Sequence, residues 1–338
     1  MTARTGMTAA ALARAAAMAG FAPSVHNTQP WRWTILADSM VLSVVRERQL
    51  NAVDPEGRLL MISCGAALHH ARAALAAIGW EHEVQRLPDP QRPDLLAVLT
   101  PTAHHEPAAD AVRVLQDMER RHTDRRPLSD ESVPGEHLSV IAEAVRAEGN
   151  HLHVLSGEQV YDLAAAADRA GAVETADPEI QQELAYWIGR GGGLGIPEQI
   201  LPAEQPETTV PERNFGRTGG LPTSPGHDRA AAFGVIYGDG DEPESWLRAG
   251  EALSAGWLAA TRLGVSVLPL SAAVEVLTTR TTLRRLISDL GWPYLVLRLG
   301  VADAEHGYRD GAGPAHTERL PVNQIVDTAE VRHLLDRA

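Results

Sequence analysis

The chain has 338 residues, of which 44% are hydrophobic, and a formal net charge of −14. An acidic chain repels phosphate backbones, so nucleic acid is excluded as an expected partner. The single cysteine, Cys64, excludes an internal disulfide and a zinc site built from cysteines. Lysine is absent, so every permanent side-chain cation is an arginine.

The first predicted element is an alanine-rich helix over residues 7–20. Arg14 interrupts its apolar run, which favours a helix of the mature fold over a signal peptide. No apolar run approaches about 18 residues, the length that a membrane span requires. We therefore expect a cytoplasmic protein with no membrane partner.

The next segment, residues 22–33, reads APSVHNTQPWRW and combines hydrogen-bonding side chains with large aromatic rings. Three of its polar side chains could bind the edge of a polar ring: Ser24, Asn27 and Gln29. The alternative is a hydrogen-bonded turn that leads into a strand, with Trp31 and Trp33 in the core.

Two glycine-bounded segments, 65–79 and 250–264, can be aligned with each other. In both, small and apolar residues recur with the period of a buried helix. Strands are expected at 31–36, 80–87, 95–100, 151–155, 265–270 and 294–299. The pattern suggests that one strand–helix–strand unit occurs twice, although two unrelated alanine-rich helices would also align.

Residues 189–227 are punctuated by glycine and proline and have neither a helical nor a strand period. A segment of that length inside a compact enzyme is typical of a lid or binding loop. Its apolar residues favour a packed lid over a solvated linker. The glycines at 189–195 are not in GxGxxG register, so they do not indicate a dinucleotide-binding fold.

Residues 119–128 read ERRHTDRRPL and place four arginines around His122 and Thr123. Arginine forks suit phosphate oxygens, but a charged helix end in solvent is an equally good interpretation. The histidine pairs at 69–70 and 104–105 have no suitably placed third ligand, so we expect solvated or core-edge histidines and no metal site.

Taken together, these segments resemble motifs of the FMN-dependent nitroreductase family, most closely its Acg-like actinobacterial branch. Residues 23–31 (PSVHNTQPW) are similar to the Ser/Asn motif that follows the first long helix of that family. Residues 121–125 (RHTDR) resemble its phosphate- and ribityl-binding motif, and 319–321 (RLP) its late phosphate-binding arginine. Residues 264–272 (GVSVLPLSA) resemble the strand whose end borders the flavin.

The resemblance implies FMN as cofactor, with NAD(P)H as the reductant. It implies that the flavin itself carries the chemistry, with no catalytic side chain and no metal. The implied cofactor-binding residues are Ser24, Asn27, Gln29, Arg121, Thr123, Arg125, Pro269, Leu270, Ser271, Ala272 and Arg319. Ser271 stands where the family has a glutamate, and the lysine often found close to flavin N1 has no counterpart.

The order of the motifs implies one composite site. In ordinary family members the phosphate and Ser/Asn motifs meet at a dimer interface, whereas here each half carries one of them. The second half reads GNHLH at 149–153, where its Ser/Asn motif is expected. We therefore expect an internally duplicated α+β, nitroreductase-like fold in which one chain mimics the homodimer, with helices around a central antiparallel or mixed sheet.

The expected halves are residues 1–115 and 116–338, with the lid inserted at about 189–227 in the second half. We expect a monomer, with a dimer as the alternative. The implied function is transfer of electrons from NAD(P)H through FMN to a small-molecule acceptor of the nitroaromatic or quinone type. The alternative is a flavin-sequestering, storage or sensing protein whose closed lid permits little or no turnover.

Overall fold

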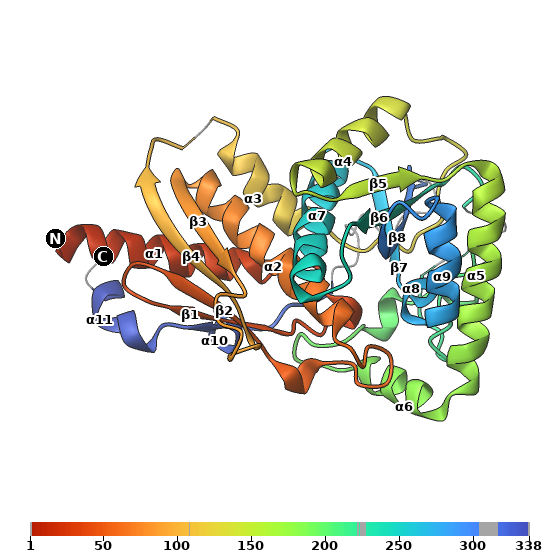
Figure 1. Ribbon diagram of the computed structural model, residues 1–338, viewed down its shortest axis with the longest axis horizontal. Helices are drawn as coiled ribbons and strands as arrows, with labels where there is room; N and C mark the ends of the chain where they lie inside the picture. The colour runs from red at the N-terminus through yellow and green to blue at the C-terminus, as the bar shows by residue number, and fades with distance from the viewer. Residues whose placement is uncertain (1, 108, 222, 224–227, 304–316, 337–338) are drawn as a thin grey trace.

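The computed structural model describes residues 2–107, 109–221, 223, 228–303 and 317–336. Two halves, each a sheet with helices packed on it, lie side by side, and the long helices α2 (Arg58–Ala77) and α7 (Pro243–Arg262) meet where the halves join (Figure 1). Both termini lie at the same end of the molecule.

The first half contains α1 (Thr2–Ala19), the short turn η1 (Val25–Asn27), β1 (Trp31–Ile35), β2 (Met40–Val44), η2 (Arg46–Arg48), α2, β3 (Trp80–Arg86), β4 (Leu95–His104) and α3 (Ala111–Arg120). The second half contains α4 (Gly135–Ala147), β5 (His151–Val154), α5 (Gly157–Ala176), α6 (Pro178–Trp187), η3 (Glu198–Ile200), β6 (Ala232–Gly238), α7, β7 (Ser266–Leu270), α8 (Ala272–Glu275), α9 (Leu277–Leu286) and β8 (Trp292–Gly300). The chain ends with α10 (Val322–Ile325), β9 (Val326–Asp327), η4 (Ala329–Val331) and α11 (Arg332–Leu335).

The two sheets share one strand order. The five-stranded sheet runs β3-β4-β2-β1-β9, and the four-stranded sheet runs β7-β8-β6-β5 when read from the matching edge. All neighbours are antiparallel except β9, which pairs in parallel with β1 and returns the C-terminal segment to the first sheet. In each half the long helix comes after the second strand in the sequence and before the third: α2 stands between β2 and β3, and α7 between β6 and β7. These observations confirm the α+β class, with two sheets in place of a single central one.

The central helices correspond residue by residue. Each bound of α7 is the matching bound of α2 plus 185, and the same offset relates Gly65 to Gly250. Both helices begin seven residues before these glycines, so the glycine-bounded segments gave their starts too late. Both are followed by a left-handed glycine, Gly79 and Gly264 (φ 85° and 71°), which is a common way for a helix to end.

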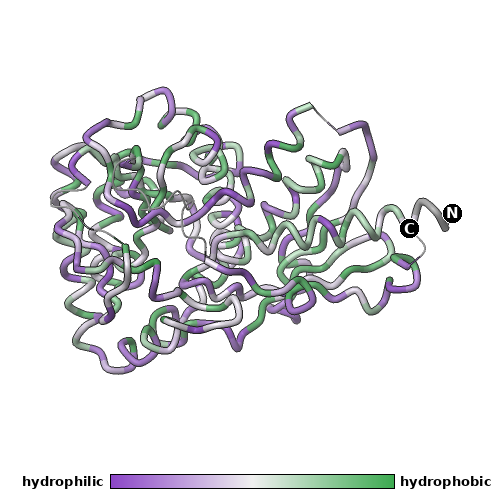
Figure 2. Tube along the Cα trace, turned by 180° about the vertical axis from the view of Figure 1, so that it is seen from behind, coloured by the Kyte–Doolittle hydropathy of each residue, from purple (hydrophilic) through white to green (hydrophobic). Residues whose placement is uncertain are grey.

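Six strands were predicted at their observed places, and β2, β6 and β9 were not. Trp31 and Trp33 of β1 are fully buried, as the strand alternative for the aromatic motif predicted. The loops at the periphery carry much of the hydrophilic sequence (Figure 2).

Helix α2 is the only helix in the described part of the chain that is long and apolar enough to cross a membrane. The sequence of α2 has no continuous apolar run of about 18 residues, because arginine and histidine residues interrupt it. Of its most apolar window, 78% is buried inside the fold, mainly against α7. It is the core helix of this protein.

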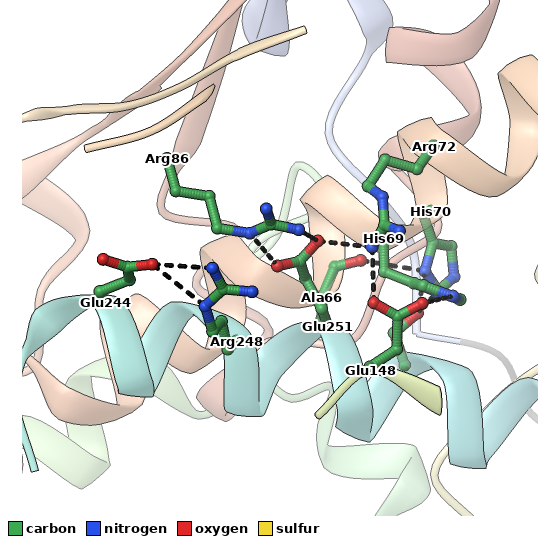
Figure 3. A network of polar contacts seen from close by, with 10 residues as sticks. Ala66, His69, His70, Arg72, Arg86, Glu148, Glu244, Arg248 and Glu251 are labelled. Atoms are coloured by element: carbon green, nitrogen blue, oxygen red, sulfur yellow. Dashed lines mark hydrogen bonds and ion pairs between the residues drawn. The ribbon is translucent and has the colours of Figure 1, made fainter. Parts of the chain in front are cut away.

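A buried ion-pair network joins α2, α7 and β3 (Figure 3). Glu251 is 1% exposed and accepts hydrogen bonds from Arg72 (2.6 Å) and Arg86 (2.7 and 2.9 Å). Arg72 also donates to Glu148 at 2.6 Å. A buried carboxylate is tolerated here because two guanidinium groups surround it.

The adjacent histidines share one hydroxyl. His69 Nδ1 and His70 Nδ1 lie 2.7 and 2.8 Å from Ser254 Oγ, and Ser254 is itself the counterpart of His69 under the offset of 185. His70 is fully buried, so the expectation of a solvated or core-edge residue was wrong for it. Burial, with Arg121 nearby, lowers the pKa of His70 well below its usual value, and the ring is neutral.

Candidate functional site

A cavity of about 710 Å³ lies between the two halves. It is bounded by residues of both central helices, for example Ser63 of α2 and Trp257 of α7, and by the segment that follows β7. Ten of the eleven residues predicted to bind a cofactor line it: Ser24, Asn27, Arg121, Thr123, Arg125, Pro269, Leu270, Ser271, Ala272 and Arg319. The structure thus brings together segments that are separated by almost 300 residues in the sequence.

The backbone of the first motif is strained. His26, Asn27 and Gln29 have φ angles of 44°, 55° and 47°, a left-handed region that residues other than glycine rarely adopt. Ser24 Oγ accepts the Gln29 amide N–H at 3.0 Å, and Ser63 Oγ accepts that of Val25 at 3.1 Å. Hydroxyl groups on the motif itself and on α2 therefore hold this turn against the cavity.

Asn27 lines the cavity, but other parts of the chain use its amide group. Nδ2 donates to the carbonyl oxygens of Gly193 (3.0 Å), Gly195 (3.1 Å) and Glu318 (3.0 Å). Oδ1 accepts a hydrogen bond from Arg319 at 3.0 Å. The residue predicted to recognise a ring thus ties the lid to the C-terminal segment.

Gln29 is fully buried and does not line the cavity. Its Nε2 donates to the carbonyl of Gly193 at 2.6 Å, and its Oε1 accepts the amide N–H of Leu320 at 2.9 Å. Gly193 has φ +82°, and a Cβ there would lie 2.4 Å from the Arg319 carbonyl oxygen. Only glycine fits between these segments, so Gln29 supports the site without reaching into it.

Arg121 follows the end of α3 and is 3% exposed. Its guanidinium lies 4.5 Å from the centre of the Trp257 ring, and Nη2 donates weakly to the Phe21 carbonyl (3.3 Å). Nε and Nη1 are buried with no hydrogen-bond partner. Burial, with Arg319 nearby, lowers the pKa of Arg121 well below its usual value. The alternative of a solvated helix end therefore does not hold for this residue.

Two further arginines reinforce this positive charge. Arg319 Nε is also buried without a partner, and burial lowers the pKa of Arg319 to about 10. Among the described residues, no carboxylate lies within ion-pair distance of Arg125, whereas its neighbour Arg126 pairs with Asp124 at 2.6 Å. A second cavity of about 230 Å³ adjoins this cluster and shares Arg121, Thr123 and Arg319.

Unpaired buried guanidinium groups are costly, and an anion with several acceptor oxygens would satisfy them. A phosphate monoester fits these donors, since it offers oxygens to more than one arginine at once. This end of the cavity therefore presents the kind of donors that a phosphate group would require.

The lid segment packs over the cavity. Its described part, residues 189–221 and 223, buries Ile196, Ile200, Leu201, Val210 and Leu221, and the remaining residues of the predicted segment lie outside the described residues. The described part of this segment is therefore packed against the fold, and its action as a lid stays a prediction.

Arg213 fastens this lid, and nothing in the sequence singled it out. Its Nη2 donates to Glu174 Oε1 (2.8 Å) and to Glu275, and its Nη1 lies 2.9 Å from His26 Nε2. All of these side chains except the ring of His26 are at most 7% exposed. Its three partners come from three separate segments, which no local sequence pattern relates.

Most of the chain is similar in sequence to known proteins. Residues 118–284 match the profile of the Nitroreductase family. "Putative NAD(P)H nitroreductase Rv3131" of Mycobacterium tuberculosis (strain ATCC 25618 / H37Rv) is 35% identical over 91% of this chain and 89% of its own length. "Putative NAD(P)H nitroreductase acg" of the same strain is 31% identical over 90% of this chain and 91% of its own length.

Among solved structures, a nitroreductase with bound FMN from Bacteroides fragilis NCTC 9343 aligns with 62% of this chain and 98% of its own, with 14% identity and a TM-score of 0.38. One from Desulfitobacterium hafniense DCB-2 aligns with 60% and 94%, with 15% identity and a TM-score of 0.35. The family assignment depends on the sequence relatives, which are at least 31% identical to this chain over about nine tenths of its length. The chain belongs to the nitroreductase family.

Proposed function

We propose that this chain binds one FMN in the composite cavity and transfers electrons from NAD(P)H to a small planar acceptor of the quinone or nitroaromatic type. The observation that carries the proposal is a set of buried guanidinium nitrogens without hydrogen-bond partners, Nε and Nη1 of Arg121 and Nε of Arg319, at one end of a cavity of about 710 Å³. Relatives named as NAD(P)H nitroreductases and solved nitroreductases with bound FMN agree with it.

Arg121, Arg125 and Arg319 would hold the phosphate, and the hydroxyl of Thr123 lies beside them on the cavity wall. The fit is physical: the phosphate would pair donors that are otherwise buried without a partner, and its negative charge would offset the burial and the nearby Arg319 charge that lower the pKa of Arg121. Trp257 holds the Arg121 guanidinium in place from the opposite side.

The ring would lie against the segment after β7, from Pro269 to Ala272. Ser24 Oγ already accepts the Gln29 N–H, so its own hydrogen is available to donate to a ring atom. When bound, FMN supplies a two-electron carrier that accepts and returns a hydride. The residues of the chain bind and orient it, and the packed lid excludes water.

Two residues that line the cavity have counterparts in the other half that form ion pairs. Trp257 and Ser271 line the cavity, and their counterparts under the offset of 185 are Arg72 and Arg86. Both arginines bind the buried Glu251, so ion-paired side chains occupy the equivalent place (Figure 3). This asymmetry supports one FMN per chain, and the shared strand order supports an internal duplication in which a monomer mimics the family dimer, with the halves divided near residue 115.

A second function is favoured by the lid. The Arg213 latch and the Asn27 contacts hold the segment closed over the cavity, an arrangement suited to a cytoplasmic protein that stores or senses flavin with little turnover. Both functions need the same cofactor site, but only the oxidoreductase needs the lid to admit NAD(P)H.

The test is spectroscopic. Protein purified with FMN should be yellow, and anaerobic NADPH or NADH should bleach it, with colour restored by menadione. Rapid bleaching with turnover supports the oxidoreductase and eliminates the storage function. A yellow colour that persists supports the storage function and eliminates the oxidoreductase. A chain that takes up no FMN contradicts both.

A further inference from the structure

His26 is placed on the lid side of the cavity. Its ring lines the cavity, packs edge-on against Phe215 of the lid (centroids 5.7 Å apart, interplanar angle 81°), and is held through Nε2 by Arg213. The residue has a left-handed φ of 44°, which costs backbone energy that the surrounding contacts must offset. This conformation carries the ring toward the lid.

The contact with Arg213 fixes the tautomer of His26. A guanidinium group can only donate hydrogen bonds, so Nε2 must be the acceptor at 2.9 Å. In the neutral ring the proton then resides on Nδ1. Burial and the nearby charges of Arg213 and Arg125 lower the pKa of His26 well below its usual value, which keeps the ring neutral.

Nδ1 therefore carries a hydrogen, and no described residue accepts it. Arg213 in turn cannot rotate away without leaving the buried carboxyl groups of Glu174 and Glu275 without the hydrogen-bond donor that they share. The lid thus holds a neutral hydrogen-bond donor in one orientation at the cavity wall.

We propose that the Nδ1–H of His26 is the hydrogen-bond donor for a carbonyl or nitro oxygen of the planar molecule that lies between the lid and the bound cofactor. Such an oxygen is a neutral hydrogen-bond acceptor. It suits the neutral His26 ring, which packs nearly at a right angle to the ring of Phe215. The inference rests on the proposed function, because it assumes that the cofactor occupies the rest of the cavity. His26 is then a positioning and specificity residue for the second ligand, and it is distinct from the residues that hold the phosphate.

The experiment compares two ligands and two variants. Nicotinamide has a ring carbonyl substituent and pyridine has none, and both are titrated against the FMN-loaded chain by the change in flavin absorbance. His26→Asn keeps a donor at the same distance from Cβ, tolerates the left-handed backbone and loses the Arg213 contact. His26→Phe keeps a ring and loses the donor.

One neutral hydrogen bond corresponds to a preference for nicotinamide over pyridine of about 3- to 10-fold. We expect the wild type and His26→Asn to show this preference and His26→Phe to lose it, with unchanged flavin content in all three. An unchanged preference in His26→Phe, no preference in the wild type, or an effect on flavin content alone overturns the inference and leaves the proposed function standing. Absence of flavin in the wild type overturns both.

Discussion

Gly65 of α2 and Gly250 of α7 lie against each other where the two central helices cross. A Cβ on Gly65 would lie 1.9 Å from the carbonyl oxygen of Leu247, and a Cβ on Gly250 would lie 2.0 Å from that of Ile62. The contact is reciprocal, as expected for equivalent positions on either side of a pseudo-twofold axis. The helices can approach this closely only because neither residue has a side chain.

The first prediction concerns this crossing. Gly65→Ala should destabilise the fold by about 1–3 kcal/mol or more, because the added methyl group meets backbone that cannot move without separating the helices. Gly171→Ala in α5 is the matched control, since nothing lies within 4 Å of its added Cβ. There the same change should stabilise by about 0.5–1 kcal/mol through helix propensity. Urea unfolding of both variants checks the signs, and equal effects would contradict the close approach.

The second prediction concerns the ion-pair network. Glu251→Gln should cost about 3–5 kcal/mol, because it leaves Arg86 buried beside a neutral group and removes one of the two carboxylates of Arg72. Glu244→Gln on the same helix breaks an exposed pair with Arg248 and should change stability by less than about 0.5 kcal/mol. Flavin content should stay the same in both. A Glu251→Gln protein as stable as the Glu244→Gln protein would show that the network contributes little.

The sequence predicted local elements and missed what depends on distant contacts. The strands β1, β3 and β8 follow from their apolar and aromatic runs, and Trp31 and Trp33 from their alternation. Strand β6 was missed because alanine and glycine at its ends obscure the pattern. The starts of α2 and α7 were placed late because a glycine inside a helix resembles a helix boundary until the neighbouring helix that requires it is known.

The site was predicted by motif and corrected by contacts. Ten predicted residues share the cavity because the motifs mark where the chain turns toward it. The roles of Asn27 and Gln29 could not be inferred, since their partners at Gly193 and Leu320 lie far along the chain. Arg213 and Glu174 give no local signal at all, because a buried ion pair is defined by burial, which composition does not encode.

The third prediction is a pH dependence of the lid latch. Burial raises the pKa of Glu174 from 4.5 to about 7, and the nearby Glu275 adds to the shift. Between these values the folded chain keeps a proton that the unfolded chain has released, so the free energy of unfolding should decrease as the pH rises from about 4.5 to about 7 and then level off. Above that range a second negative charge is buried beside one arginine, and the lid should open more readily.

Glu174→Gln removes this titration and keeps the shape of the side chain. Burial also raises the pKa of Asp54 to about 7, so the wild type and the variant must be compared over the same pH series. We expect the difference in unfolding free energy between them to change between about pH 4.5 and pH 7, and limited proteolysis within residues 189–221 to become faster only in the wild type. Parallel curves would rule out Glu174 as the group responsible.

The last prediction separates cofactor binding from stability. Arg121→Met keeps most of the volume beside Trp257 and removes a guanidinium group with two buried nitrogens, Nε and Nη1, that have no hydrogen-bond partner. Each charge-assisted hydrogen bond to a phosphate is worth about 1.5–3 kcal/mol, so FMN affinity should fall by about 10- to 150-fold. Without FMN the variant should be at least as stable as the wild type, because an uncompensated buried charge has been removed.

The neighbouring Arg120 is exposed, so Arg120→Met should change neither the FMN affinity nor the stability of the apoprotein. Fluorescence quenching of free FMN and urea unfolding of the apoprotein measure the two effects. Weaker binding together with an equally large loss of apoprotein stability would mean that Arg121 serves the fold and not the phosphate.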